Sequence, residues 1–359
     1  MLVILTCSFS AVLYGQQTIS VPIIAEGHQA AHSLRDSDLK VEVDHQPATV
    51  ASFTPLAGQH LLYALIYGEK RNTLWPKGSE QQADVVRQFL KEVITAGVDI
   101  GSLINFSDVD FLDVEDQKDP QQLVAKLWND RSEAAVYDAV VATAEHLAGK
   151  PDIPGYRKVM FLFCDGEDNL SLVKLNQAIE RLQRDGISLF IFAPSTVRKK
   201  TQGKNLSKLA LELGGRVYFL PDDTKTVSFD SVKQDLARSF LLKISIPPSE
   251  AMETLNVVDS SQAKVPIIAP SQIGIPLNRS SAPLIQSSAQ TSQPAQWRRP
   301  ASQEQLAELR AKCAPYMNTK IEDVESKRIA LPPHECAEVL SWMRDSRMER
   351  LYGSEKPAR

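Results

Sequence analysis

The sequence lacks several features by which classes of protein are recognised. Cysteine is scarce, with four residues in 359, and no two of them form a CxxC pair, so a zinc site of the usual spacing is not expected. Acidic and basic residues are interleaved and the formal net charge is −4, unlike the clustered basic face of a nucleic-acid-binding protein. No segment after the N-terminus is long and apolar enough to cross a membrane. The sequence therefore predicts a globular mature chain without a nucleic-acid partner or a transmembrane segment.

Signatures of catalysis are also missing. The chain contains no GxxxxGK[ST], GxSxG or HExxH motif. Cys164 ends an apolar run and has no His near it in sequence, so we expect a packed core thiol rather than a nucleophile. The acidic stretch of residues 108–119 lacks the Gly and terminal Glu of an EF-hand loop, and it is either the solvated face of a hairpin or a weak calcium site. We predict that the chain is not an enzyme; clustered carboxylates with a His in one cleft would indicate otherwise.

The N-terminal segment has the length of a signal-peptide core. Leu2–Leu13 reads LVILTCSFSAVL, which is apolar and too short to span a bilayer. The basic residues that usually precede such a core are missing, since the first Lys or Arg is Arg35. We predict that residues 1–16 are a signal peptide and that the protein is extracytoplasmic, either periplasmic or secreted. A buried strand is the alternative interpretation.

From residue 61 onward, strand and helix patterns alternate. Leu61–Tyr67 is a continuous apolar run, typical of a strand covered on both faces, and a helical pattern with Gly97 after its end follows. The next predicted elements are strands at 100–106, 111–116, 158–164, 187–193 and 216–220, and helices at 120–129, 133–148, 171–185, 205–215 and 227–242. Such alternation predicts a doubly wound, mostly parallel, Rossmann-like α/β sheet between two layers of helices.

The segments around this core have different compositions. Residues 17–54 are predicted as a short β lead-in, irregular to residue 38 and then a strand at 39–45, and the α/β domain covers 55–245. Residues 246–303 are rich in Ser, Gln and Pro and predict a disordered linker, followed by a small helical tail at 304–353. Cys313 and Cys336 lie in the two helical runs of that tail, where they either pair in an oxidising compartment or remain free thiols.

Three segments resemble the von Willebrand factor A (VWA) family, over about half of the chain. Phe161–Asn169 (FLFCDGEDN) is similar to the family's apolar strand ending in Asp-Gly, and Ala134–Thr143 (AAVYDAVVAT) to its helix entry. The stretch LINFSDVDFLDVEDQKDPQQLVAKL resembles its second and third strands with the helix after them. The preceding VEVDHQPATVASF resembles a subgroup of exported proteins with this domain from acidobacteria.

The resemblance implies a divalent-ion site at the carboxyl ends of the strands, but the residues depart from it. The family's ligands are a DxSxS loop, a Thr and an Asp, and its open coordination position takes a partner's carboxylate. Here Tyr67, Glu69 and Arg71 stand at the DxSxS positions and Ala134 at the Thr position, so that only Asp165 matches. One carboxylate does not satisfy the octahedral preference of Mg²⁺. We therefore predict a degenerate site and no cofactor, with residual Mg²⁺ or Mn²⁺ binding as the alternative.

Two cations in the first loop prompt a further hypothesis. Arg71, or Lys70 beside it, replaces the charge of the metal by pairing with Asp165 and offers a partner carboxylate a bidentate contact. The alternative is that both are solvated loop charges. For Asp138, in the helix entry, we expect hydrogen bonds to backbone donors of the neighbouring loops, with direct contact to a partner as the alternative.

These patterns predict an exported binding module that takes a protein or another ligand at its upper loops, where open α/β sheets place their sites. An envelope assembly protein acting through its helical tail is the alternative function. The oligomeric state stays open. The candidate contact residues are Tyr67, Glu69, Lys70, Arg71, Asp165, Glu167 and Asp168.

Overall fold

The computed structural model describes the part of the chain that contains the expected α/β core. The described residues are 17–27, 34–68, 75, 78–106, 110–127, 135–183, 186–221, 227–246, 253–261 and 264–273. The predicted signal peptide, the helical tail with Cys313 and Cys336, and the loop containing Glu69, Lys70 and Arg71 lie outside them. Within the described residues, no helix has the length and apolar character needed to cross a bilayer.

A six-stranded sheet forms the centre of the molecule, in the order β10-β9-β8-β5-β6-β7. All neighbouring strands run parallel except β6 and β7, which form an antiparallel pair at one edge. The predicted doubly wound, mostly parallel sheet is therefore confirmed. The strands are β5 (His60–Gly68), β6 (Ile100–Phe106), β7 (Asp110–Gln117), β8 (Tyr156–Phe163), β9 (Ser188–Pro194) and β10 (Val217–Leu220).

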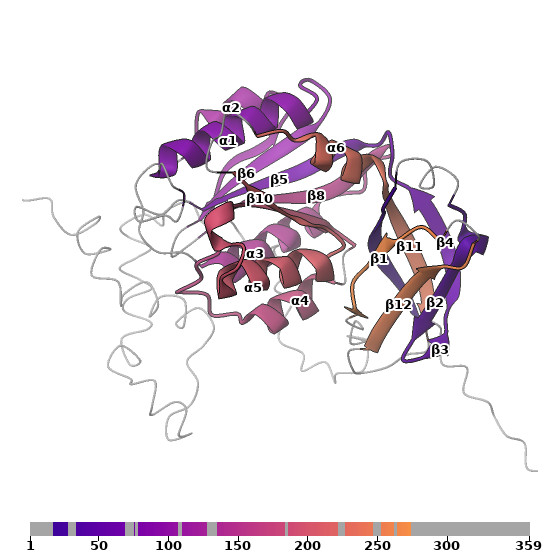
Figure 1. The fold of residues 1–359 in the computed structure, drawn as a ribbon. Helices are drawn as coiled ribbons and strands as arrows, with labels where there is room; N and C mark the ends of the chain where they lie inside the picture. Colours follow the sequence, from indigo (N-terminus) through magenta and orange to yellow (C-terminus); the bar gives the residue numbers. More distant parts are fainter. Residues whose placement is uncertain are drawn as a thin grey trace, which may run out of the picture. The chain divides into compact units, whose positions relative to one another are not determined.

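Helices cover both faces of this sheet (Figure 1). One face packs against α1 (Gly78–Val93), α2 (Pro120–Val124) and α6 (Asp230–Ala237). The other packs against α3 (Val136–Gly149), α4 (Leu175–Leu182) and α5 (Thr201–Glu212), with the short η2 (Ser195–Val197) before α5.

The core between the first layer and the sheet is aromatic. Phe89 of α1 lies edge-on to Phe161 and Phe163 of β8, with ring centroids 4.8 and 5.3 Å apart, and 5.0 Å from Phe192 of β9. All four rings are fully buried. Each buried ring contributes a large hydrophobic stabilisation, so this contact fixes α1 against the central strands.

A second structural unit is built from the two ends of the described chain. One of its two sheets has the order β13-β1-β11-β4 and the other the order β14-β12-β2-β3, and they share one apolar core. The α/β core is therefore inserted between β4 and β11 of this β unit, whose short η1 (Asp36–Asp38) precedes β2. The strands are β1 (Gln17–Ala25), β2 (Leu39–Val43), β3 (Gln46–Pro47), β4 (Thr49–Pro55), β11 (Ser239–Ile246), β12 (Glu253–Asp259), β13 (Ile267–Ile268) and β14 (Gln272–Ile273).

Three sequence predictions are corrected by this unit. The expected irregular segment at 17–38 contains β1, whose Ile19, Val21 and Ile23 are buried on the core of the β unit. The helix predicted for 227–242 ends at Ala237, because the residues from Ser239 onward pair with β1 as β11. The predicted linker does not begin at residue 246, since residues 253–273 contain β12, β13 and β14.

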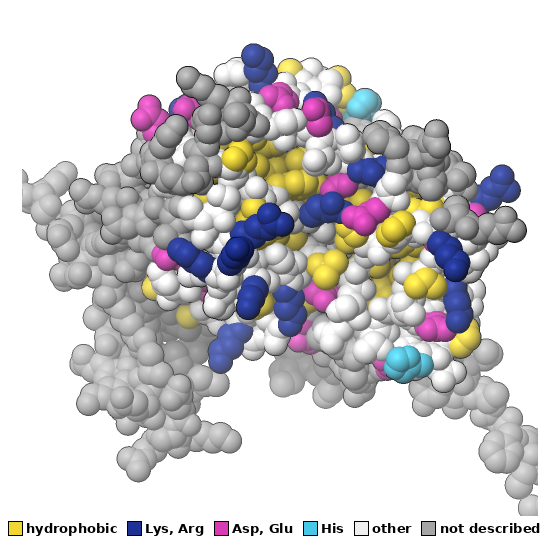
Figure 2. Space-filling model, in the orientation of Figure 1, with side chains coloured by type: hydrophobic (Ala, Val, Ile, Leu, Met, Phe, Trp, Pro, Cys, Tyr) yellow, Lys and Arg dark blue, Asp and Glu magenta, His cyan; other side chains and the backbone are white. Residues whose placement is uncertain are grey.

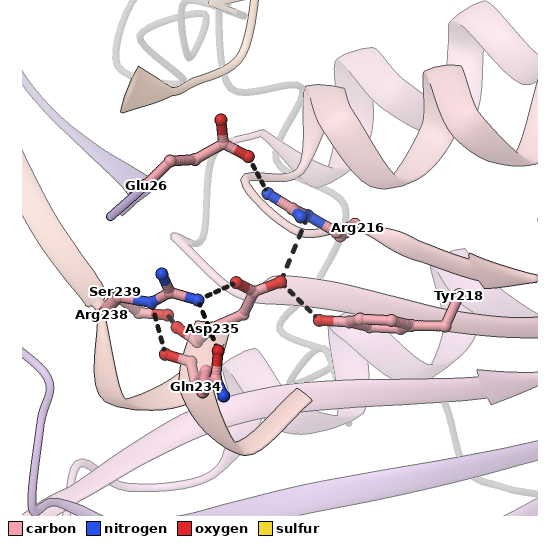
Figure 3. A network of polar contacts seen from close by, with 7 residues as sticks. All are labelled: Glu26, Arg216, Tyr218, Gln234, Asp235, Arg238 and Ser239. Atoms are coloured by element: carbon pink, nitrogen blue, oxygen red, sulfur yellow. Dashed lines mark hydrogen bonds and ion pairs between the residues drawn. The ribbon is translucent and has the colours of Figure 1, made fainter. Parts of the chain in front are cut away.

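A polar network joins the β unit to the α/β core (Figure 3). Asp235 of α6, whose side chain is only 3% exposed, accepts a hydrogen bond from the Tyr218 hydroxyl at 2.7 Å. The same carboxylate pairs with Arg216 Nε at 3.2 Å and with Arg238 Nη2 at 3.3 Å. Arg216 also pairs with Glu26, at the end of β1, at 2.5 Å. Two guanidinium groups thus compensate the buried charge of Asp235.

Candidate functional site

The carboxyl edge of the central sheet is the place where open α/β sheets bind ligands. There, β5 ends at Gly68 and β8 ends at Phe163. Gln82 of α1 is fully buried and its Nε2 donates to the carbonyl of Gly68 at 2.8 Å and to that of Phe163 at 3.0 Å. One amide therefore holds the ends of the two central strands together.

The loop after β8 begins with Asp165, which is 5% exposed. Its Oδ1 accepts a hydrogen bond from the Glu167 amide at 3.1 Å, and Gly166 adopts a φ of +75°. A Cβ atom at Gly166 would lie 2.7 Å from Leu206 Cδ1 of α5, so the loop passes too close to α5 for a larger residue. The site of Asp165 is therefore built by close packing of this loop on α5.

The same loop also caps the N-terminus of α3, although the two segments are more than 30 residues apart in the sequence. Asp168 accepts from the Val136 amide at 2.8 Å, and the Ser171 hydroxyl accepts from the amides of Tyr137 at 3.0 Å and Asp138 at 3.2 Å. The adjacent Ala135 provides no side-chain cap. Burial raises the pKa of Asp168, and its hydrogen bonds to Ser171 and to the α3 amides oppose that rise. Capping groups on the loop after β8 thus satisfy the first amides of α3.

Asp138 makes the reciprocal contacts. Its two carboxylate oxygens accept from the amides of Leu172 at 2.8 Å and Val173 at 2.9 Å. This confirms the expectation that Asp138 binds backbone donors and shapes the neighbouring loop. Because each segment caps the other, the loop and the helix entry are held in one arrangement.

The described residues do not fit the metal site implied by the VWA resemblance. Gln82 uses its Nε2 to hold the two strand ends, which is the role of a donor and not of a metal ligand. Its Oε1 is buried and accepts no hydrogen bond from the described part of the chain, where it is a single amide oxygen without a group of carboxylates around it. The carboxylates of Asp138 and Asp168 already accept bonds from backbone amides. Among the residues that the structure describes, no three His, Cys, Asp or Glu side chains are grouped so that they could hold an ion.

The candidate residues from the sequence have different positions. Tyr67 is fully buried beside the aromatic core, so its prediction as a contact residue is wrong: a buried ring presents no surface to a partner. Asp165 is buried, Glu167 and Asp168 are half-buried, and Glu69, Lys70 and Arg71 lie outside the described residues. Cys164 is buried in the core beneath this edge, as expected.

Three residues at this edge were not predicted as site residues: Gln82, Ser171 and the exposed Leu172. Gln82 occupies an inward position of an amphipathic helix, and a polar residue there was a detectable signal. Ser171 stands three residues after Asp168, but its partners are 34 and 33 residues away, so local patterns did not reveal them.

Part of the chain matches a known protein family. Residues 80–232 match the von Willebrand factor type A domain, whereas no curated protein matches the sequence. Similar solved structures include BatB from Bacteroides thetaiotaomicron, with 10% identity and a TM-score of 0.39 over 50% of this chain and 98% of that one. The von Willebrand factor type A protein from Catenulispora acidiphila has 12% identity and a TM-score of 0.37 over 72% and 73%.

A third similar structure is proximal thread matrix protein 1 from the mussel byssus, with a zinc-occupied MIDAS motif, at 15% identity and a TM-score of 0.38. The match covers 53% of this chain and 48% of the mussel chain, which is about half the length of that protein. The sheet order, the two helical layers and the family match together show that this chain contains a VWA domain, matched over residues 80–232.

Proposed function

We propose that the protein is an extracytoplasmic binding module that takes a protein partner at the carboxyl edge of its VWA sheet without a metal ion and without catalysis. VWA domains are generally interaction modules, which supports the binding role. The apolar N-terminal run Leu2–Leu13 supports export.

The observation that carries this proposal is the reciprocal capping between α3 and the loop after β8. Asp138, Asp168 and Ser171 direct their oxygens at backbone amides, with distances of 2.8–3.2 Å. These contacts order this part of the edge through protein groups, which supports binding without an ion. A loop that is ordered before binding loses less conformational entropy when a partner docks, which favours affinity.

Arg71 and Lys70 complete the proposal. Their sequence positions follow the strand that ends at Gly68, and we infer that a guanidinium there would pair with Asp165 and offer a bidentate contact to a partner carboxylate. Replacing Arg71 with Ala should lower both thermal stability and partner binding. If neither changes, Lys70 and Arg71 are solvated charges.

Thermal unfolding of the full chain tests metal independence. Its midpoint in EDTA should equal that in excess Mg²⁺, Mn²⁺ or Ca²⁺, because an ion bound only by the native state would raise the midpoint by mass action. An ion-selective rise of several degrees that disappears in Asp165→Ala would contradict the proposal.

Site-specific photo-crosslinking tests the binding role. A photoreactive residue is placed at Glu167, on the carboxyl edge, and as a control at Lys91, exposed on α1. In the cells that make the protein, position 167 should capture one defined protein and position 91 should not. Equal capture at both positions, or none at 167, would rule out partner binding at this edge.

A further inference from the structure

The layer formed by α4 and α5 presents a strongly basic surface, which we call the basic face. Among the described residues of 174–212, Glu180 is the one exposed acidic residue. Figure 2 shows Lys and Arg side chains gathered over the region where α5 lies. The basic face consists of the exposed residues Lys174, Arg181, Arg198, Lys199, Lys200, Lys204 and Lys208.

Helical spacing aligns these charges. Lys200 stands at the N-cap position of α5 without a side-chain capping bond. Lys204 and Lys208 follow at intervals of four residues, so the three lie on one side of the helix along about 12 Å. Lys208 Nζ donates to Asn176 Oδ1 of α4 at 2.9 Å, which places α4 directly beside this row. The two helices therefore form one continuous positive surface.

In the opposite helical layer, basic side chains form ion pairs with acidic neighbours. There, Arg87 pairs with Asp84 at 2.5 Å and Lys233 pairs with Asp230 at 2.6 Å. Within the described part of the chain, no residue of the basic face has an ion-pair partner. Uncompensated like charges repel one another and create a field that attracts an anionic partner.

Exposed leucines lie at both ends of the basic face. Leu172 is 70% exposed and Leu170 is 36% exposed, and the amide of Leu172 is held by Asp138 at 2.8 Å. Their loop is in contact with α5 near Gly166 and leads into α4. Leu211, near the C-terminal end of α5, is 40% exposed. Apolar side chains in fixed positions beside a row of lysines offer two kinds of contact to one ligand.

We propose that the basic face binds an acidic, leucine-containing segment of a protein partner. The proposal rests on the proposed function and names the chemistry of its partner. Carboxylates of such a segment pair with Lys200, Lys204 and Lys208, and its apolar side chains pack on Leu170 and Leu172. Electrostatic complementarity of this kind sets specificity and accelerates association.

Three other occupants fit less well. The described residues of α4 and of 198–212 include no aromatic side chain, and the Phe219 ring beside them is half-buried under Arg198, whose Cζ lies 6.0 Å from the ring centroid. Single-stranded nucleic acids stack on exposed aromatic rings, and membrane-surface helices commonly insert them. The charges follow a row along a helix instead of surrounding the leucines, which suits an extended or helical peptide better than a planar bilayer. The C-terminal segment 304–359 has equal numbers of acidic and basic residues, so it is not an acidic ligand.

Fluorescence anisotropy with the full chain tests the proposal. The probe is a labelled synthetic peptide of Glu with Leu at every fourth position, and the control probe has Gln in place of Glu. The variant Lys200→Glu/Lys204→Glu/Lys208→Glu should bind the Glu–Leu probe at least about tenfold more weakly, since three attractions become repulsions. The matched control is Lys91→Glu/Lys118→Glu/Lys126→Glu, whose lysines are exposed elsewhere on the domain and whose charge change is the same.

The expected results are specific. The control variant should bind within about twofold of the original chain, Leu172→Ser should weaken binding severalfold, and 0.5 M NaCl should weaken it about tenfold through screening. Circular dichroism establishes that each variant is folded. Equal binding by the two triple variants, or binding of the Gln probe as tight as that of the Glu probe, would overturn the proposal.

Other ligands of the basic face would give different experimental results. Tighter binding of duplex DNA, or of vesicles containing phosphatidylglycerol, that is lost only in the triple variant of the basic face would overturn the peptide assignment. Acetylation of Lys200, Lys204 and Lys208 in the free chain much slower than that of Lys91 would mean that the chain covers its own face. If peptide binding fails while crosslinking at Glu167 persists, the proposed function stands and this inference alone is wrong.

Discussion

Removal of the Asp235 carboxylate should weaken the junction between the β unit and the VWA domain more than any single surface change. The carboxylate is nearly inaccessible and accepts from Tyr218, Arg216 and Arg238 at 2.7, 3.2 and 3.3 Å. In Asp235→Ala these three groups lose a shared acceptor, and two guanidinium groups are left close together without the charge between them.

The magnitude follows from the burial of the partners. Breaking a buried ion pair by removing one member typically costs about 3–5 kcal/mol of unfolding free energy. The Arg216 side chain is 34% exposed and that of Arg238 is 16% exposed, so water replaces part of the loss. We therefore expect about 3 kcal/mol for Asp235→Ala, which corresponds to a midpoint lower by about 6–12 °C. Asp235→Asn keeps one oxygen acceptor and should cost about 1–2 kcal/mol.

Urea unfolding of the full chain, followed by far-UV circular dichroism and tryptophan fluorescence, measures these differences. The control is Asp230→Asn on the same helix, where the carboxylate is 68% exposed and pairs with Lys233; no measurable change is expected. If Asp235→Ala unfolds at the same urea concentration as the control, the network contributes nothing to stability and the reasoning is refuted.

Three further predictions concern other buried positions. Gly214 has a φ of +62°, and a Cβ atom there would lie 2.1 Å from the Pro22 carbonyl oxygen. Gly214→Ala should therefore lower the free energy of unfolding, measured in urea, by at least about 2 kcal/mol. At the control position Gly149 nothing lies within 4 Å of the added Cβ, so Gly149→Ala should not lower it. Burial raises the pKa of the Cys164 thiol, and we expect no reaction with a thiol reagent until the chain unfolds; reaction with the native chain at the rate of a free thiol would contradict its burial. Burial and a nearby lysine lower the pKa of His146, so the imidazole binds a proton in the unfolded state before it does so in the folded state as the pH falls through about 6.5, and the free energy of unfolding decreases. His146→Gln should lose less unfolding free energy than the original chain between about pH 7.5 and 5.5. An equal loss in the two chains would assign the decrease to other groups.

Much of the VWA domain was predictable because its signals are local. The apolar runs Leu61–Tyr67 and Lys158–Cys164 became the central strands β5 and β8, since continuous burial on both faces requires continuous apolar sequence. That Asp138 accepts hydrogen bonds from backbone amides was predictable from its place in a helix entry. Its donors, Leu172 and Val173, lie 34 and 35 residues away and were not predictable from local patterns. The basic loop at Lys70 and Arg71 remains a prediction.

The β unit was not predictable by the same means. Gln17 pairs with Ile246 and Ile24 with Ser239, so the partner strands lie more than 200 residues apart. Burial of Ile19, Val21 and Ile23 depends on this distant pairing. Periodicity indicates which face of a strand is apolar but carries no information about which strand lies beside it.

The sequence alone determined the order of strands and helices in the VWA domain, because this order depends on residue type and local spacing. The loss of all but one of the family's metal ligands stays a prediction. The tertiary structure decided which residues lie together at the carboxyl edge of the sheet and on the basic face. Ser171 and Asp168 became caps of α3 through contacts more than 30 residues away in sequence. The basic residues of 198–208, which are interleaved with neutral residues, became one basic face with Lys174 and Arg181, because the packing of α4 beside α5 buries the apolar positions and brings the two sets of charges together.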